Sequence, residues 1–185
     1  MKYIILLILF LCLHKINAQE STAYVEQSVF GLQTGLFGVW VHNEAKLSST
    51  IALKSEVGLD AGFGGSENDL EFVLVPVLRL EPRWYHSLKR RAEKGRNTAK
   101  NSANFLGLGV WYYPDLFVIS DFEQVDISNS VAIIPKYGLK RTYWDHFTLE
   151  AGGGVGYFRI FNGETADDFN SGVAIDLHLR IGYTF

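Results

Sequence analysis

The sequence has very little cysteine. Its 185 residues include one, Cys12, and that residue lies inside an apolar stretch near the amino-terminal end. A lipoprotein signal would have a small residue directly before this cysteine, and Leu11 is not small. Cys12 therefore belongs to a leader that is removed, and we expect no cysteine and no disulfide in the mature chain. No group of histidine, cysteine and aspartate residues has metal-ligand spacing, so we predict neither a metal site nor a cofactor.

Long apolar runs are missing after the first 18 residues. Residues 1–18 have the form of a secretory signal peptide, with a positive charge at Lys2 and an apolar segment over Tyr3–Leu13. That segment is too short for a spanning helix, which needs about 20 residues. We predict a cleaved leader over 1–18 and one mature domain over 19–185.

A strong excess of charge of one sign is also absent. The formal net charge is −3, and removal of the leader takes away Lys2 and Lys15. This mild balance does not indicate a nucleic-acid partner. The mature chain is expected either to be soluble in the periplasm or to span a membrane as a barrel.

The sequence does contain strict alternation of apolar and polar residues. At its end one side reads Ile175, Leu177, Leu179, Ile181, Tyr183 and Phe185, and the other reads Asp176, His178, Arg180, Gly182 and Thr184. Such alternation is typical of a β-strand with different surroundings on its two faces. The pattern recurs over 51–63, 72–81 and 149–157, and more weakly over 103–113 and 130–140. A tilted transmembrane strand needs about 9–11 residues, and these runs are long enough.

The strand count depends on residues 24–46, which are too many for one strand. A split near Thr34–Gly35 gives a hairpin and eight strands in all. The alternative keeps Ser28–Glu44 as one strand and adds another at Asp115–Phe122, because bacterial single-chain barrels have an even number. Turns or loops are predicted at His42–Ala45, Gly64–Asp69, Tyr143–His146 and Asn162–Gly172.

These strands predict an all-β fold, a closed antiparallel up-and-down transmembrane barrel. In hydrocarbon every backbone polar group must be paired, and closure achieves this for strands. An eight-stranded barrel is narrow and filled by side chains, which argues against an open pore. We expect its interior charges to pair as a network, since unpaired buried charges are costly. The predicted network comprises Lys54, Glu56, Asp60, Arg79, Glu81, Glu150, Asp176, His178 and Arg180.

Aromatic residues near the predicted strand ends are interpreted as interfacial girdles, where rings have one wet edge. They are Trp40, Trp84, Tyr85, Trp111, Tyr112, Tyr113, Trp144 and Tyr183.

One connection between strands is basic and helix-permissive before Gly95. Its cations are Lys89, Arg90, Arg91, Lys94, Arg96 and Lys100. It is interpreted as a contact for anionic lipid headgroups, as a docking element for a partner, or as a solvated linker. With the hairpin split it falls at the periplasmic end of the barrel, and with the alternative split it falls outside the cell.

No reaction is indicated by the sequence. Asp176, His178 and Glu150 share one face, but no serine lies at a recognisable spacing and the interval of two is that of any strand face. Gly152, Gly153, Gly154 and Gly156 do not form a phosphate loop, because no helix with Lys-Ser/Thr follows. Their expected role is close packing.

The leader, the repeated alternation and residues 177–185 resemble the small eight-stranded outer-membrane barrels of the OmpA/OmpX-like group. The resemblance implies a Gram-negative outer membrane as location and outer-membrane lipid as surroundings. It also implies insertion machinery that reads Tyr183 and Phe185 during assembly. Members of that group include adhesins, structural proteins and enzymes, so the fold does not determine the function.

The sequence thus predicts an integral outer-membrane barrel with a structural or surface-interaction role and no catalysis. One alternative is a lipocalin-like periplasmic carrier of an apolar ligand, whose apolar faces would point inward. Another is a lipid-active enzyme with a site at the barrel rim.

Overall fold

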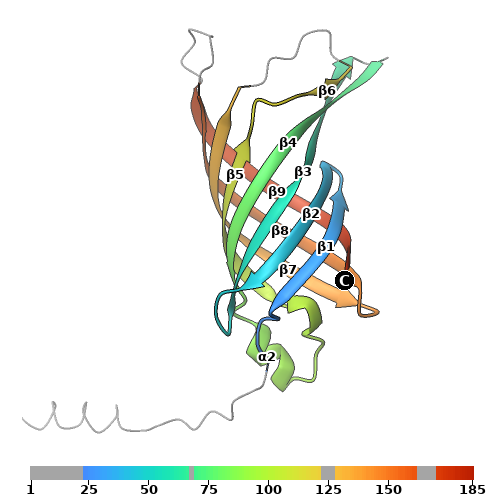
Figure 1. Cartoon of the computed structure of the whole chain (residues 1–185), viewed down its shortest axis with the longest axis vertical. Helices are drawn as coiled ribbons and strands as arrows, with labels where there is room; N and C mark the ends of the chain where they lie inside the picture. Colours follow the sequence, from blue (N-terminus) through green and yellow to red (C-terminus); the bar gives the residue numbers. More distant parts are fainter. Residues whose placement is uncertain (1–22, 67–68, 122–127, 162–169) are drawn as a thin grey trace, which may run out of the picture.

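The chain forms a closed antiparallel β-barrel whose wall has eight strands (Figure 1). The computed structural model describes residues 23–66, 69–121, 128–161 and 170–185. The strands are β1 (Ser28–Gly35), β2 (Gly38–Lys46), β3 (Ile51–Ser66), β4 (Asp69–Trp84), β5 (Asn104–Tyr113), β6 (Ile119–Ser120), β7 (Ser130–Tyr143), β8 (Phe147–Ile160) and β9 (Ser171–Thr184). Between β4 and β5 lie the helix α2 (Leu88–Glu93) and the 3-10 turn η1 (Ala99–Asn101).

The barrel closes because β1 pairs with β2 on one side and with β9 on the other. All other neighbours in the wall are also antiparallel, as expected when each strand returns beside the previous one. The two-residue β6 pairs with β4 beyond the end of β5, so it continues the path of β5 along β4. The predicted fold class and the hairpin split near Thr34–Gly35 are therefore confirmed.

Two predicted turns are wrong. The loop predicted at Gly64–Asp69 is mostly strand, since β3 extends to Ser66 and β4 begins at Asp69. Residues His42–Ala45 lie inside β2, and the chain reverses instead at 36–37 and 47–50. His42 and Glu44 are buried, whereas Asn43 and Ala45 are half-buried on the opposite face. This segment is polar because one of its faces points to a charged interior, and not because it forms a turn. The tight connection predicted at Tyr143–His146 is confirmed, since β7 ends at Tyr143 and β8 begins at Phe147.

One end of the barrel holds the last residue, α2 and the short connections at 47–50 and 144–146, and we call it the C-terminal end (Figure 1). A small apolar core closes this end. It consists of Val25, Ala52, Tyr85, Leu88, Ala103 and Phe105, all buried. The basic connection therefore packs against the barrel and lies at the end that contains the C-terminus.

Several predictions fall outside the described residues. They are the leader over 1–18 and most of the loop at 162–172. Within the described part of the chain, no helix has the length and apolarity needed to cross a membrane.

Candidate functional site

The barrel interior holds charged side chains in equal numbers of each sign. In the described part of the chain there are six cations and six carboxylates, and all but Asp60 are less than 9% exposed. They are Lys54, Arg79, Arg83, Lys136, Lys140 and Arg180 with Glu44, Glu56, Asp60, Glu81, Glu150 and Asp176. All nine residues of the predicted network lie in this interior, His178 included. Equal numbers allow each buried charge an opposite partner, which offsets part of the cost of desolvation.

Arg83 is the most connected cation near the C-terminal end. Its Nη1 and Nη2 donate to Glu150 at 2.9 and 2.6 Å, its Nε donates to Glu81 at 2.8 Å, and Nη1 also lies 3.2 Å from Glu44. Lys140 Nζ donates to the same Glu44 carboxylate at 3.0 Å. The planar guanidinium suits several carboxylates at once, which an ammonium group would bind less specifically.

The network joins the apolar closure of the barrel through Tyr85 and Asn101. The Tyr85 hydroxyl and the Asn101 amide both donate to Glu44 Oε2, at 2.9 and 2.8 Å. Burial raises the pKa of Tyr85 well above its ordinary value, and the charge of Glu44 acts in the same direction. The phenol therefore remains protonated and donates to Glu44. This hydrogen bond anchors the segment between β4 and β5 to the charged interior.

Glu56 gathers three cations in the middle of the barrel. Lys54 Nζ lies 2.7 Å from it, Arg79 Nη1 donates to it at 2.7 Å and Arg180 Nη1 at 2.9 Å. Arg79 also binds Asp60 through Nη2. One carboxylate thus links β3, β4 and β9.

Aromatic rings separate the cations toward the other end of the barrel. The Trp40 ring lies 4.1 Å from the Arg180 guanidinium and 5.3 Å from that of Arg79. The Trp111 ring lies 4.4 Å from Arg79 and 5.2 Å from Lys136 Nζ. The five side chains form an alternating series of cations and rings, which we call the cation–π series. Each contact adds electrostatic attraction to the ring face.

This series corrects the predicted girdle. Trp40, Tyr85 and Trp111 are buried inside the barrel, where their rings meet charged groups or the apolar core. Tyr113 is also turned inward, and its hydroxyl donates to Asp60 at 2.7 Å. The exposed members of the predicted set are Trp84, Tyr112, Trp144 and Tyr183. The face on which a ring lies is determined by its parity along the strand, and not by its distance from the strand end.

Four interior charges were missing from the predicted network. Lys136 and Lys140 have the parity of an inward face in the sequence, and Arg83 extends the alternation of Arg79 and Glu81 by one step. Glu44 is absent from the predicted network because the polar residues 42–45 have the composition of a turn. Continuing the parity of β4 to its last residues would have identified Arg83.

Asp176 and His178 do meet, but in a closed environment. His178 Nδ1 lies 2.9 Å from Asp176 Oδ2, and Nε2 lies 3.6 Å from Glu150. Lys136 Nζ donates to Asp176 at 3.0 Å. In the described ranges His178 Nδ1 is hydrogen-bonded to Asp176 and Nε2 has no hydrogen-bond partner, and no group of three His, Cys, Asp or Glu residues could hold a metal ion.

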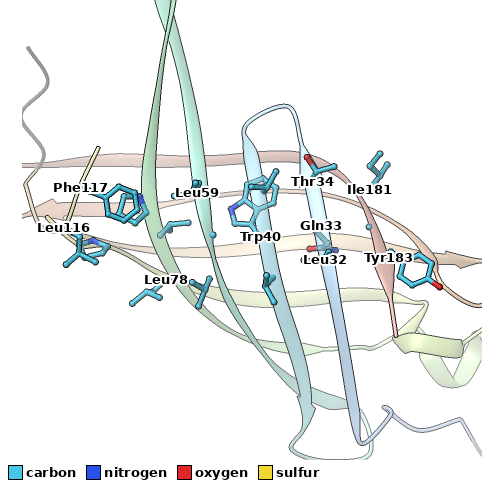
Figure 2. Close-up of a pocket in the computed structure, with 18 of the residues that line it drawn as sticks. Leu32, Gln33, Thr34, Trp40, Leu59, Leu78, Leu116, Phe117, Ile181 and Tyr183 are labelled. Atoms are coloured by element: carbon cyan, nitrogen blue, oxygen red, sulfur yellow. The ribbon is translucent and has the colours of Figure 1, made fainter. Parts of the chain in front are cut away.

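The outer surface of the wall is apolar. Leu177 is 79% exposed while its neighbour Asp176 is 5% exposed. Exposed and buried residues alternate in the same way over most of β2, β5 and β7. A groove of about 840 Å³ lies on this surface, and its lining includes Leu32 of β1, Leu78 of β4 and Ile181 of β9. Figure 2 shows these side chains spread along the groove. Exposed apolar side chains on the wall include Phe30, Leu32, Val39, Val41, Val57, Leu78, Leu80, Leu106, Leu108, Val110, Ile133, Val155, Leu177, Leu179 and Ile181.

A side cavity of about 820 Å³ lies beside the β1–β2 hairpin. This hairpin is shorter than its neighbours, so β9 before Arg180 has no pairing with β1 in the described residues. Leu36 and Ile175 line the mouth, and Arg79 and Trp111 line the inner wall.

The basic connection divides into two parts. Lys100 Nζ donates to the carbonyl oxygen of Phe185 at 2.9 Å and lies 3.9 Å from Glu26. Arg90, Arg91, Lys94 and Arg96 instead line a small pocket with Arg141 of β7. Lys89 is exposed and does not line it.

No family model, no curated protein and no solved structure matched this chain.

Proposed function

We propose that the protein is an integral membrane barrel of the bacterial outer membrane, with a structural or surface-interaction role and without catalysis. The observation that supports this proposal is the inverted distribution of polarity. Charges occupy the interior, while leucine, isoleucine and valine side chains cover the outside. Soluble monomers rarely expose apolar patches larger than a few hundred Å², and a lipid bilayer is the solvent that favours such a surface.

The closed wall supports the same proposal. Each of the eight strands pairs with a neighbour on both sides, although among the described residues β9 before Arg180 pairs with β8 alone. Closure of this kind is the requirement for a β-structure in hydrocarbon. The charged interior and the apolar closure at the C-terminal end leave little room for a permeation path, so the proposed role is not conduction. The lipocalin-like alternative is disfavoured, because its ligand would need an apolar interior.

Exposed aromatic residues at the C-terminal end are consistent with an interface there. Trp84, Tyr143, Trp144 and Tyr183 are between 47% and 85% exposed. Tyr183 and Phe185 lie together with ring centroids 5.3 Å apart. Recognition of Tyr183 and Phe185 by the insertion machinery remains a prediction.

Alkaline carbonate extraction of cells that express the full chain tests the proposal. We expect the mature protein to remain with the outer-membrane fraction and to float with lipid in a density gradient. Release into the soluble fraction by carbonate would contradict membrane insertion and favour the carrier. For the role without catalysis, purified protein with His178→Ala should match the unaltered protein in any lipid turnover. A hydrolase or acyltransferase activity that this substitution removes would instead indicate a rim-site enzyme.

A further inference from the structure

In the part of the chain that the structure describes, a small pocket at the C-terminal end gathers cations without carboxylates. It is lined by Ser87, Arg90, Arg91, Lys94, Arg96, Asn104 and Arg141, and no carboxylate of the described chain lines it. The interior shows the opposite arrangement, with a carboxylate for every cation. A cluster of five unneutralised cations in a protein that otherwise pairs its charges calls for an anion from outside.

The cluster is built by the fold and not by sequence proximity alone. The Asn97 side chain donates to Thr142 O at 2.9 Å, which fastens the basic connection to the end of β7. Arg91 Nη2 donates to Asn97 O at 3.0 Å. Arg91 and Arg96 are thereby brought to Arg141, about fifty positions away in the sequence.

Arg141 is held in place from the side of the strands. Its Nη1 donates to Lys140 O at 2.7 Å, and its Nη2 donates to Asn104 Oδ1 at 2.6 Å. The Asn104 amide donates in turn to the Tyr137 hydroxyl at 2.6 Å. A guanidinium fixed in this way loses less conformational freedom when it binds a ligand.

The cations of the pocket repel one another. Burial lowers the pKa of the Arg91 guanidinium, and the positive charges of Arg141 and Arg96 lower it further. Arg91 Nε is buried with no hydrogen-bond partner in the described structure. One anion placed among the guanidinium groups would accept a hydrogen bond from this donor and would also reduce the repulsion between the cations.

The size and position of the pocket indicate the kind of anion. Its volume is about 90 Å³, the share of roughly three water molecules, which suits a single oxyanion and not an acyl chain. Arg141 belongs to the outward face of β7, between the exposed Tyr137 and Tyr143. Arginine binds phosphate through paired N–H donors, and exposed tyrosines mark the level of lipid headgroups.

We propose that this pocket binds the phosphate group of an anionic phospholipid in the leaflet at the C-terminal end of the barrel. This inference rests on the proposed membrane insertion. Arg91 and Arg141 are the central ligands, while Arg90, Lys94 and Arg96 add positive charge around them. Free inorganic phosphate has the same chemistry, and the experiment separates the two sources.

The test uses the full mature chain in nanodiscs of phosphatidylcholine with a minor fraction of phosphatidylglycerol, and it measures co-purified lipid by native mass spectrometry. The unaltered protein should retain phosphatidylglycerol in preference to phosphatidylcholine. The double variant Arg91→Gln/Arg141→Gln should lose about 30-fold in that preference, since each cation near the surface contributes about a factor of five or more. The control variant Lys89→Gln/Arg159→Gln changes the charge equally outside the pocket and should keep the preference.

Each outcome has one meaning. If the protein does not enter these nanodiscs, the membrane proposal fails. If it enters but retains phosphatidylglycerol no better than the double variant does, the lipid site is wrong. A second arm measures inorganic phosphate binding by calorimetry in neutral detergent. Phosphate binding that Arg91→Gln/Arg141→Gln abolishes, without any preference for phosphatidylglycerol, would overturn the lipid source in favour of free phosphate.

Discussion

Arg83 and Glu150, 67 positions apart in the sequence, are joined across the barrel interior by hydrogen bonds of 2.9 and 2.6 Å. Both side chains are among the fully buried ones. The pair is the centre from which Glu44 and Glu81 are also neutralised. Of these three carboxylates, Glu150 depends most on Arg83, because Glu44 and Glu81 each have a lysine partner as well.

Replacing the cation should be strongly destabilising. In Arg83→Met, Glu44 keeps Lys140 and Glu81 keeps Lys136, but the nearest remaining cation to Glu150 is Lys54 at 3.6 Å. Breaking one partner of a buried pair costs about 3–5 kcal/mol. Urea unfolding in detergent micelles, followed by tryptophan fluorescence, measures the loss.

A second substitution checks the cause of that loss. Arg83→Met/Glu150→Gln removes the stranded charge and should recover part of the stability, while the exposed Arg159→Met should change it little. Equal instability of the single and double variants would show that packing, and not charge, explains the effect.

The parity of the strands was readable from the sequence, and the exact members of the interior were not. Alternation from Ile175 to Phe185 gives the correct faces, because a one-residue slip would move every side chain of the strand to the other face. Glu44 was hidden because a polar run of four residues looks the same in a turn and on a strand beside a charged interior. Trp40 and Trp111 were hidden because an aromatic ring suits an interface and a buried guanidinium equally well.

The pocket with Arg141 was beyond the reach of sequence reasoning for another reason. Its cations come from the basic connection and from β7, and long-range hydrogen bonds such as those from Asn97 to Thr142 O and from Thr142 N to Ser102 Oγ bring the two together. No local pattern predicts such a long-range contact. Of the six cations of the basic connection, four line this pocket, whereas Lys100 binds Phe185 O and Lys89 is exposed.

The outward face of β9 gives a test of lipid exposure. Leu179 is 56% exposed in the middle of the strand. Leu179→Arg should cost about 2–4 kcal/mol in a bilayer if the position lies near the midplane, while Leu179→Phe should be tolerated. Equilibrium unfolding from vesicles compares the three proteins. Folding of Leu179→Arg with the stability of the unaltered protein would mean that lipid does not contact this face.

Two adjacent glycines of β8, which lie on opposite faces of the strand, differ in how closely other atoms approach them. A Cβ added at Gly154 would lie 2.3 Å from Pro135 O and 2.6 Å from Lys136 Cβ, whereas one at Gly153 would have ordinary contacts of 3.4 Å or more. Overpacking costs typically about 1–3 kcal/mol. Gly154→Ala should therefore destabilise by that amount, and Gly153→Ala should be close to neutral. Thermal melting of both variants by circular dichroism distinguishes them, and similar melting temperatures would contradict the close approach of β7 and β8.

The cation–π series predicts a specific role for Trp40. Its ring lies between the guanidinium groups of Arg79 and Arg180, and its Nε1 donates to Asp60 at 2.7 Å. Trp40→Leu removes both the ring face and the donor, so the two cations face an apolar group of smaller volume. The expected cost is about 2–4 kcal/mol, from lost volume together with lost cation–π attraction.

Trp40→Phe separates the ring from the donor. Phenylalanine keeps an aromatic face between the arginines but leaves Asp60 with Arg79 and Tyr113 as its remaining partners. This variant should lose about 1 kcal/mol less than Trp40→Leu, since the ring face still attracts a desolvated cation. The same urea titrations measure both variants. If Trp40→Phe is as unstable as Trp40→Leu, the loss of stability comes from the hydrogen bond and from side-chain volume. The ring would then only separate the two arginines and would not attract them.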